Sequence, residues 1–169
     1  MNRIHAGPFI LEPQIAAHAV EMFDVLSDPA IYEFENAPPQ SLAWLTERFT
    51  RLESRVSPDG AAQWLNWVIK LPGGALAGYV QATIPPDRTA HIAYEIASRF
   101  WRQGIGSAAV TSMLHELAAT YGVGRCLATV KEANYRSLAF LQSLGFERAG
   151  ANDFHEIIMG RTIGVVPKA

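Results

Sequence analysis

The stretch Arg99-Phe100-Trp101-Arg102-Gln103-Gly104-Ile105-Gly106-Ser107-Ala108-Ala109 decides the fold of this chain. It follows a predicted strand at 90–97 and leads directly into a predicted helix. The two glycines permit a tight turn with accessible backbone amides. The first turn of a helix adds unpaired N–H groups at the positive end of the helix dipole. The stretch therefore predicts a site for a phosphate or pyrophosphate group, to which Arg102 and Arg99 would add positive charge.

Length and composition limit the possible classes of protein. A chain of 169 residues, 49% of them hydrophobic, is expected to form one domain over 1–169. The formal net charge of −2 argues against a general nucleic-acid-binding protein. The chain has no signal-peptide pattern and no apolar run as long as a membrane span. The single cysteine, Cys126, excludes an internal disulfide framework and is expected in a strand core, so we expect a cytoplasmic protein. The five histidines have no metal-ligand spacing, so no metal is expected.

Hydrophobic periodicity predicts the order of the elements. Strands are expected at 4–11, 63–71, 75–84, 90–97, 125–130, 146–149 and 154–161. Helices are expected at 13–26 and 42–52, from the glycine turn to Tyr121, and at 134–144. The order is hairpin, strand, glycine turn, helix, strand, helix and hairpin, which indicates an α/β domain.

Three motifs in this order resemble the GNAT superfamily of acyl-CoA-dependent N-acyltransferases: the glycine turn, Asn134 with Ser137, and Leu144-Gly145-Phe146. The resemblance covers a core of residues 9–161. Trp101, the Asn134-to-Ser137 spacing and the Leu-Gly-Phe ending look most like the branch that acetylates the N-termini of ribosomal proteins. The resemblance implies a mixed, mainly antiparallel central sheet of about seven strands, flanked by about four helices and splayed apart beside the glycine turn.

The resemblance also implies how acetyl-CoA would be held as a co-substrate. The backbone amides of Gln103, Gly104, Ile105, Gly106 and Ser107 would bind the pyrophosphate. The backbone of Ile96 and Ala97 would pair with the pantetheine arm, and Ser98, Trp101 and Arg102 belong to the same cofactor-binding set. Asn134 would contact the pantetheine, and Ser137 would lie near the thioester sulfur.

The implied mechanism is direct attack of a neutral primary amine on the thioester carbonyl. It needs a base, an N–H near 95–96 for the developing oxyanion, and a weak acid for the thiolate. Glu95 is the first candidate base, because a carboxylate buried among apolar neighbours has a raised pKa, although a carboxylate at the rim of the sheet is equally consistent with the pattern. His91 lies on the same side of the strand and is a second candidate. Tyr94 faces the other way in a regular strand and is a candidate acid, an orienting group or a core residue.

Two positions depart from the family pattern. Trp101 stands where the usual pattern has Arg or Gln, although the N-terminal-acetylating branch often has Trp there. Leu141 stands where many members have a tyrosine that protonates the leaving thiolate. Leucine cannot donate a proton, so Ser137, Tyr94 or water would serve instead.

The acceptor site is less clearly marked. Candidates for it are Trp64, Asn66, Trp67, Glu33, Glu35, Asn36, His155 and Glu156. The residues at 64, 66 and 67 are also typical of a strand core, and those at 33, 35 and 36 are also typical of a solvated loop. We expect a small-molecule or peptide amine as the acceptor, no nucleic acid or membrane partner, and a monomer or homodimer.

Two other functions remain open. The pattern Gly104-x-Gly106-x-x-Ala109 meets the short fingerprint of NAD-binding oxidoreductases, with Glu132 near the end of the next strand. However, Gly104 is well separated from the preceding strand, and no second set of alternating strands and helices follows it. The other alternative is a non-catalytic acyl-CoA-binding member of the same fold, which the leucine at position 141 keeps open.

Overall fold

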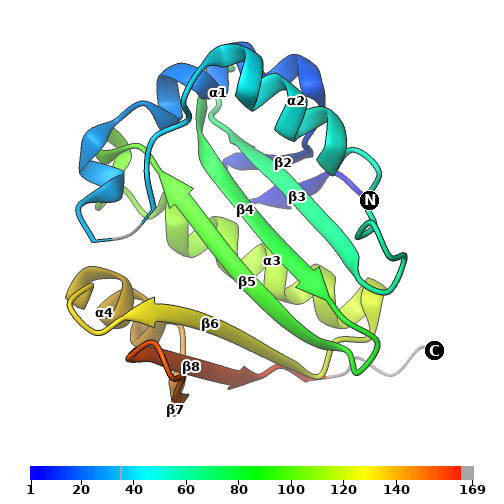
Figure 1. Cartoon of the computed structure of the whole chain (residues 1–169), viewed down its shortest axis with the longest axis vertical. Helices are drawn as coiled ribbons and strands as arrows, with labels where there is room; N and C mark the ends of the chain where they lie inside the picture. Colours follow the sequence, from blue (N-terminus) through cyan, green and yellow to red (C-terminus); the bar gives the residue numbers. More distant parts are fainter. Residues whose placement is uncertain (35, 165–169) are drawn as a thin grey trace.

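A sheet of eight strands forms the centre of the computed structural model, which describes residues 1–34 and 36–164 (Figure 1). The strands are β1 (Ile4–Ala6), β2 (Phe9–Pro13), β3 (Gln63–Lys70), β4 (Leu76–Ile84), β5 (Thr89–Ile96), β6 (Arg125–Lys131), β7 (Glu147–Ala151) and β8 (Glu156–Thr162). Their spatial order is β1-β2-β3-β4-β5-β6-β8-β7. Only β5 and β6 are parallel among the described strands, so the predicted mixed, mainly antiparallel sheet is confirmed. The doubly wound parallel sheet of an NAD-binding fold does not fit this order.

Helices cover both faces of the sheet (Figure 1). They are α1 (Ala19–Leu26), α2 (Leu42–Leu52), α3 (Ile105–Tyr121) and α4 (Tyr135–Ser143), with short 3-10 turns η1 (Ala16–His18), η2 (Pro29–Tyr32) and η3 (Ser98–Phe100). The helices α1 and α2 pack on one face, and α3 packs on the other. None of the helices in the described part of the chain is long and apolar enough to cross a membrane.

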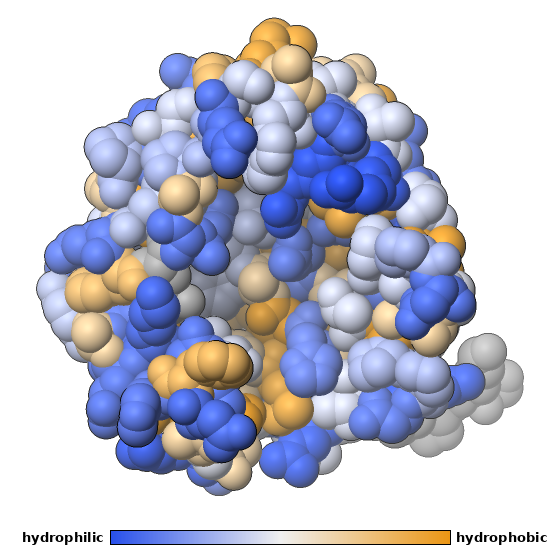
Figure 2. Space-filling model, in the orientation of Figure 1, coloured by the Kyte–Doolittle hydropathy of each residue, from blue (hydrophilic) through white to orange (hydrophobic). Residues whose placement is uncertain are grey.

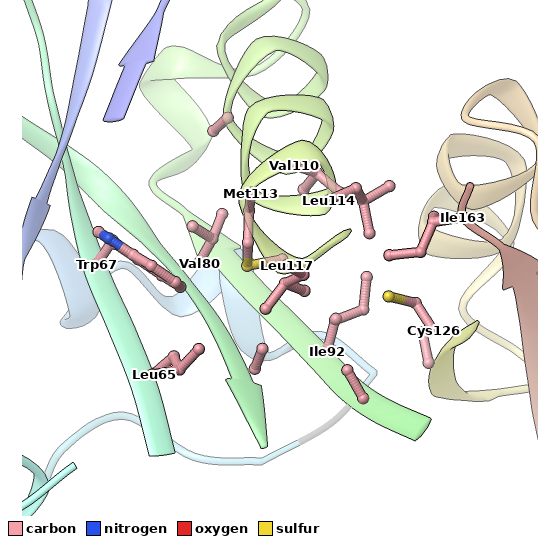
Figure 3. Close-up of a cluster of buried hydrophobic side chains, with 14 of the residues drawn as sticks. Leu65, Trp67, Val80, Ile92, Val110, Met113, Leu114, Leu117, Cys126 and Ile163 are labelled. Carbon is pink, nitrogen blue, oxygen red and sulfur yellow. The ribbon is translucent and has the colours of Figure 1, made fainter. Parts of the chain in front are cut away.

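The larger core lies between the sheet and α3 (Figure 3). Alternate residues of β3, β4 and β5 point toward this helix, among them Trp67, Val80 and Ile92. Their neighbours Val68 and Tyr79 point instead toward α1 and α2. Cys126 is fully buried in the larger core, as expected, and burial raises the pKa of its thiol to about 12. The central strands therefore have two distinct faces, and the face toward α1 and α2 carries the polar side chains described below.

The N-terminal segment corrects two predictions. The strand expected at 4–11 is two strands, because Gly7 adopts a φ of +64° before Pro8 and reverses the chain. The helix expected from Pro13 begins at Ala19, because Pro13 still pairs with Trp67 as the last residue of β2. Periodicity alone placed the helix start too early.

Candidate active site

A long opening separates β5 from β6. The two strands pair only where Thr89, Ala90 and His91 lie opposite residues 125–127. Beyond these pairs the strands diverge (Figure 1), and residues of both line a cavity of about 890 Å³. Figure 2 shows this face of the molecule hollowed near its centre. The volume suits a small-molecule site, for which the usual range is about 300–1,000 Å³.

The glycine turn lies at one end of this cavity. Arg102, Gly104, Ile105, Gly106 and Ser107 all line it. Gly104 immediately precedes α3 and has a φ of +76°, which a residue with a side chain rarely adopts. The first three N–H groups of a helix have no partner within the helix, and those of α3 belong to the lining residues 105–107. This is the geometry expected of a phosphate-binding helix start.

Gly106 lets three elements meet closely beside the turn. A Cβ at this position would lie 3.1 Å from Ile96 Cδ1 and 3.3 Å from Phe140 Cζ. The end of β5 and the helix α4 therefore both approach the first turn of α3 where only a glycine leaves room.

The end of β5 turns its backbone toward the opening. The Ala97 N–H donates to the Ala77 carbonyl at 3.0 Å, on the β4 side. Because adjacent residues of a strand point their backbone groups to opposite sides, the Ile96 N–H faces the opening. The Ile96 carbonyl accepts a hydrogen bond of 2.7 Å from the Trp101 indole. Ile96 is thus placed as the sequence suggested, with its N–H available to a ligand in the cavity.

Two other residues predicted to contact the cofactor are engaged elsewhere. The Ala97 N–H is bonded to β4, and the Ser98 N–H donates to Asp28 Oδ2 at 2.6 Å. Neither residue lines the cavity. Gln103 is also outside the lining, and its side chain donates to the Arg99 carbonyl at 2.9 Å. The extended edge offered to a ligand therefore ends at Ile96.

Gly78 fixes the position of this strand end. It lies opposite Ile96 in the β4–β5 register. A Cβ at this position would overlap the Glu95 carbonyl oxygen and would lie 2.8 Å from Ile96 Cα. The two strands are therefore in closer contact here than any residue with a side chain allows.

Glu95 lies on the wall of the cavity, on the face toward α1 and α2. The Tyr32 hydroxyl is 3.5 Å from Glu95 Oε2 and donates to the Leu26 carbonyl at 2.8 Å. Tyr79 is the register partner of Glu95 on β4. Burial and then the charge of Glu95 raise the pKa of both phenols, so Tyr32 and Tyr79 stay protonated and remain hydrogen-bond donors near this carboxylate.

Tyr94 faces the opposite side of β5, as strand alternation predicts. Its hydroxyl is 2.7 Å from Ser137 Oγ on α4, and its ring packs edge-on against Phe140 at 5.0 Å. Asn134 precedes α4 and accepts a hydrogen bond of 3.1 Å from the Ser137 N–H. The structure therefore brings together two of the predicted hydroxyl groups, and Asn134 holds the helix start that carries one of them. Leu141 is fully buried and contributes no polar group.

Most of the remaining candidates do not line the cavity. His91 is exposed where β5 and β6 still pair, and it does not line the cavity. The cavity lining also excludes Trp64, Asn66, Trp67, Glu33, His155 and Glu156, but it includes Asn36. Glu35 lies outside the described residues. Within the described ranges no group of three His, Cys, Asp or Glu side chains could hold a metal ion.

A bridge across the opening was not predicted. Arg136 on α4 pairs with Glu33 at 2.5 Å, and its guanidinium lies 4.7 Å from the Trp101 ring and 5.0 Å from the Phe34 ring. Phe34 also meets Tyr135 edge-on at 5.6 Å. The segment after η2 therefore contacts α4 on the far side of the opening. No local pattern in the sequence marks the contacts of Glu33 and Phe34, because their partners on α4 are about 100 residues away.

Known proteins share this architecture. The family model for the acetyltransferase (GNAT) domain matches residues 9–147. RimL, a ribosomal L7/L12 alpha-N-protein acetyltransferase solved in complex with coenzyme A, is 17% identical with a TM-score of 0.81, over 96% of this chain and 98% of that one. The ribosomal-protein-S5-alanine acetyltransferase from Vibrio fischeri is 16% identical with a TM-score of 0.80, over 96% of this chain and 97% of that one. RimJ from Mycobacterium smegmatis, in complex with CoA-disulfide, is 21% identical with a TM-score of 0.79, over 99% of this chain and 88% of that one.

At these identities the solved structures establish a shared fold. No curated protein matches the chain. The substrate therefore has to be argued from the site itself.

Proposed function

The chain belongs to the acetyltransferase (GNAT) domain family, and from that premise we propose that it transfers an acetyl group from acetyl-CoA to a primary amine by direct attack. One observation carries the proposal. A single cavity has the amides of a helix start at one end, the β5 edge along its wall, and a carboxylate beside that edge. The amides suit a pyrophosphate, the edge suits the amide groups of a pantetheine arm, and the carboxylate suits a cationic amine.

Each end of the cavity has residues suited to acetyl-CoA. The amides of residues 105–107 and the guanidinium of Arg102 would hold the pyrophosphate. The β5 edge up to Ile96 would pair with the pantetheine arm. The Ile96 N–H would then face the thioester oxygen, where a donor stabilises the negative charge that develops during attack.

Proton transfer is divided between the two faces of β5. The ammonium group of the acceptor first gives one proton to Glu95, directly or through a water molecule. The nitrogen then forms its bond to the acetyl carbon, and the bond between that carbon and sulfur breaks. The nitrogen then loses a second proton to the Tyr94–Ser137 pair, and the pair gives a proton to the departing sulfur. CoA therefore leaves as a thiol, and Glu95 releases its proton to solvent.

The first experiment measures ligand binding and turnover separately. Calorimetry with acetyl-CoA, CoA and NAD(H) should give binding of the first two only. Release of free thiol over a panel of amines should identify acceptors. Glu95→Gln should lower kcat at least tenfold with little change in acetyl-CoA affinity, whereas Glu47→Gln, which changes an exposed carboxylate on α2, should alter neither. A Glu95→Gln variant with the wild-type rate at every pH would remove Glu95 as the base.

The buried Leu141 favours one alternative, a protein that binds acyl-CoA without transferring it. Binding of acetyl-CoA without turnover of any amine would support that alternative. The presence of a single cysteine, Cys126, supports placing the protein in a reducing compartment, the cytoplasm.

A further inference from the structure

The part of the cavity toward α2 contains a cation that the proposed chemistry does not use. Arg48 lines the cavity and is half-buried. Its guanidinium lies 5.6 Å from the ring of Trp44, one helical turn earlier. It forms no ion pair with any other described residue, whereas Arg136, on the far side, is paired with Glu33. Arg48 is therefore available to a negatively charged group in the cavity.

The carboxylate of Glu95 and the guanidinium of Arg48 act on the same part of the cavity. Both influence the phenols of Tyr32 and Tyr79. Burial and Glu95 raise the pKa of each phenol, and Arg48 opposes that rise. The acceptor side of the cavity thus has a negative group beside the β5 edge and a positive group on α2, with two aromatic rings near both.

Gln14 provides a second, independent observation. It is only 2% exposed, it lines the same cavity, and its side-chain Nε2 has no hydrogen-bond partner among the described residues. Its backbone is fixed, because its N–H donates to the Asn66 carbonyl at 2.9 Å and its carbonyl accepts from Arg55. A buried donor without a partner costs about 1–3 kcal/mol. An oxygen atom of a bound molecule would supply the missing partner.

We propose that the acceptor carries a carboxylate on the same molecule as its amine, with the amine beside Glu95 and the carboxylate bound by Arg48 and Gln14. This inference rests on the proposed acetyl transfer. Arginine binds carboxylates through two parallel hydrogen bonds, which fixes the orientation of the acceptor. A polyamine fits this site poorly, because its second cation would face the guanidinium.

The test compares acceptors that differ only in one carboxylate. One arm uses α-, β- and γ-amino acids against their C-terminal amides. The other arm uses peptides with Asp as the second residue against the same peptides with Asn. In the arm whose spacing fits, wild-type kcat/KM should be at least tenfold higher for the carboxylate than for its neutral counterpart. The arm that shows this preference identifies a free amino acid or a peptide as the source of the carboxylate.

Two arginines of α2 provide a matched pair of variants. Arg48→Met should raise KM for the carboxylate acceptor about tenfold or more and bring the preference close to one. Arg51→Met removes the same charge from an exposed position outside the cavity and should leave the preference unchanged. Gln14→Met should reduce the preference several-fold, with its thermal stability and acetyl-CoA affinity measured in parallel. A wild-type preference near one in both arms, or an unchanged preference in Arg48→Met, overturns the proposal.

Calorimetry separates this inference from the proposed function. The probes are the N-acetyl derivatives of the same amino acids and acidic peptides, titrated into the protein with CoA bound. Binding that is lost in Arg48→Met but retained in Arg51→Met supports the carboxylate site, even if no amine is acetylated and the proposed transfer fails. Acetylation without any preference for carboxylates supports the transfer and overturns the carboxylate site.

Discussion

Replacing Gly78 by alanine tests whether the end of β5 is the reactive edge of the site. The new Cβ would overlap the Glu95 carbonyl oxygen and would lie 2.8 Å from Ile96 Cα. Non-bonded carbon atoms pack at about 3.5–4.0 Å, so the strand would have to retreat by roughly 0.7 Å or more. A displacement of about 1 Å at a reacting group costs on the order of 100-fold in rate. We therefore expect kcat/KM for amine acetylation to fall 10- to 100-fold, on that same scale.

The same substitution should also lower stability. Forcing one methyl group into a packed contact costs about 1–3 kcal/mol, which lowers the Tm of a chain of this size by roughly 2–12 °C. Gly73→Ala is the matched control, because a Cβ there meets nothing within 4 Å. The assay is thiol release under saturating acetyl-CoA, with Tm followed in parallel. If Gly78→Ala kept the wild-type kcat/KM, the Glu95–Ile96 edge would not be where the reaction occurs.

Three further predictions concern the parts around this edge. Gly106→Val should abolish acetyl-CoA binding by calorimetry, because even a single Cβ there lies 3.1 Å from Ile96 Cδ1; retained affinity would rule out the phosphate site. Tyr94→Phe and Ser137→Ala should each lower kcat about tenfold and should not be additive, because the two hydroxyls act as one pair; additive losses in the double variant would contradict this. Burial opposes ionisation of Asp28, but hydrogen bonds from Ser98 and Ala30 outweigh it and hold its pKa below 3.8. Asp28→Asn should therefore lower Tm at pH 7. The difference in Tm from wild type should disappear as the pH falls through the lowered pKa of Asp28 in the folded protein. A difference that persists in acid would show that ionisation is not the cause.

Local sequence predicted the parts of the fold that depend on neighbours along the chain. The glycines at 104 and 106 marked the start of α3, and alternation placed Glu95 and Tyr94 on opposite faces of β5. Prediction from local sequence failed near Pro13, where pairing with Trp67 extends a strand into a segment that has helical periodicity. The partner on a neighbouring strand decided the outcome there, and periodicity carries no information about that partner.

The candidate site was only partly predictable for the same reason. Glu95, Tyr94 and Ser137 could be named from spacing and resemblance, and the structure places all three on the cavity wall. Arg48 could not be named, because its role depends on how α2 packs beside α1 on one face of the sheet. Gly78 looked like any strand glycine until the register placed it opposite Ile96.

The short parallel pairing of β5 with β6 divides the sheet into two parts that separate beyond the paired residues. Three residue pairs join the two parts of the sheet, and α3 packs against both parts on one face. The smaller part, formed by β6, β8 and β7, is therefore held to the larger part by few backbone hydrogen bonds, so it should open locally more easily. A ligand lying along β5 would fill the opening between β5 and β6 and would hold the two parts of the sheet together. Amide hydrogen exchange in β6 should then slow when the cofactor is bound.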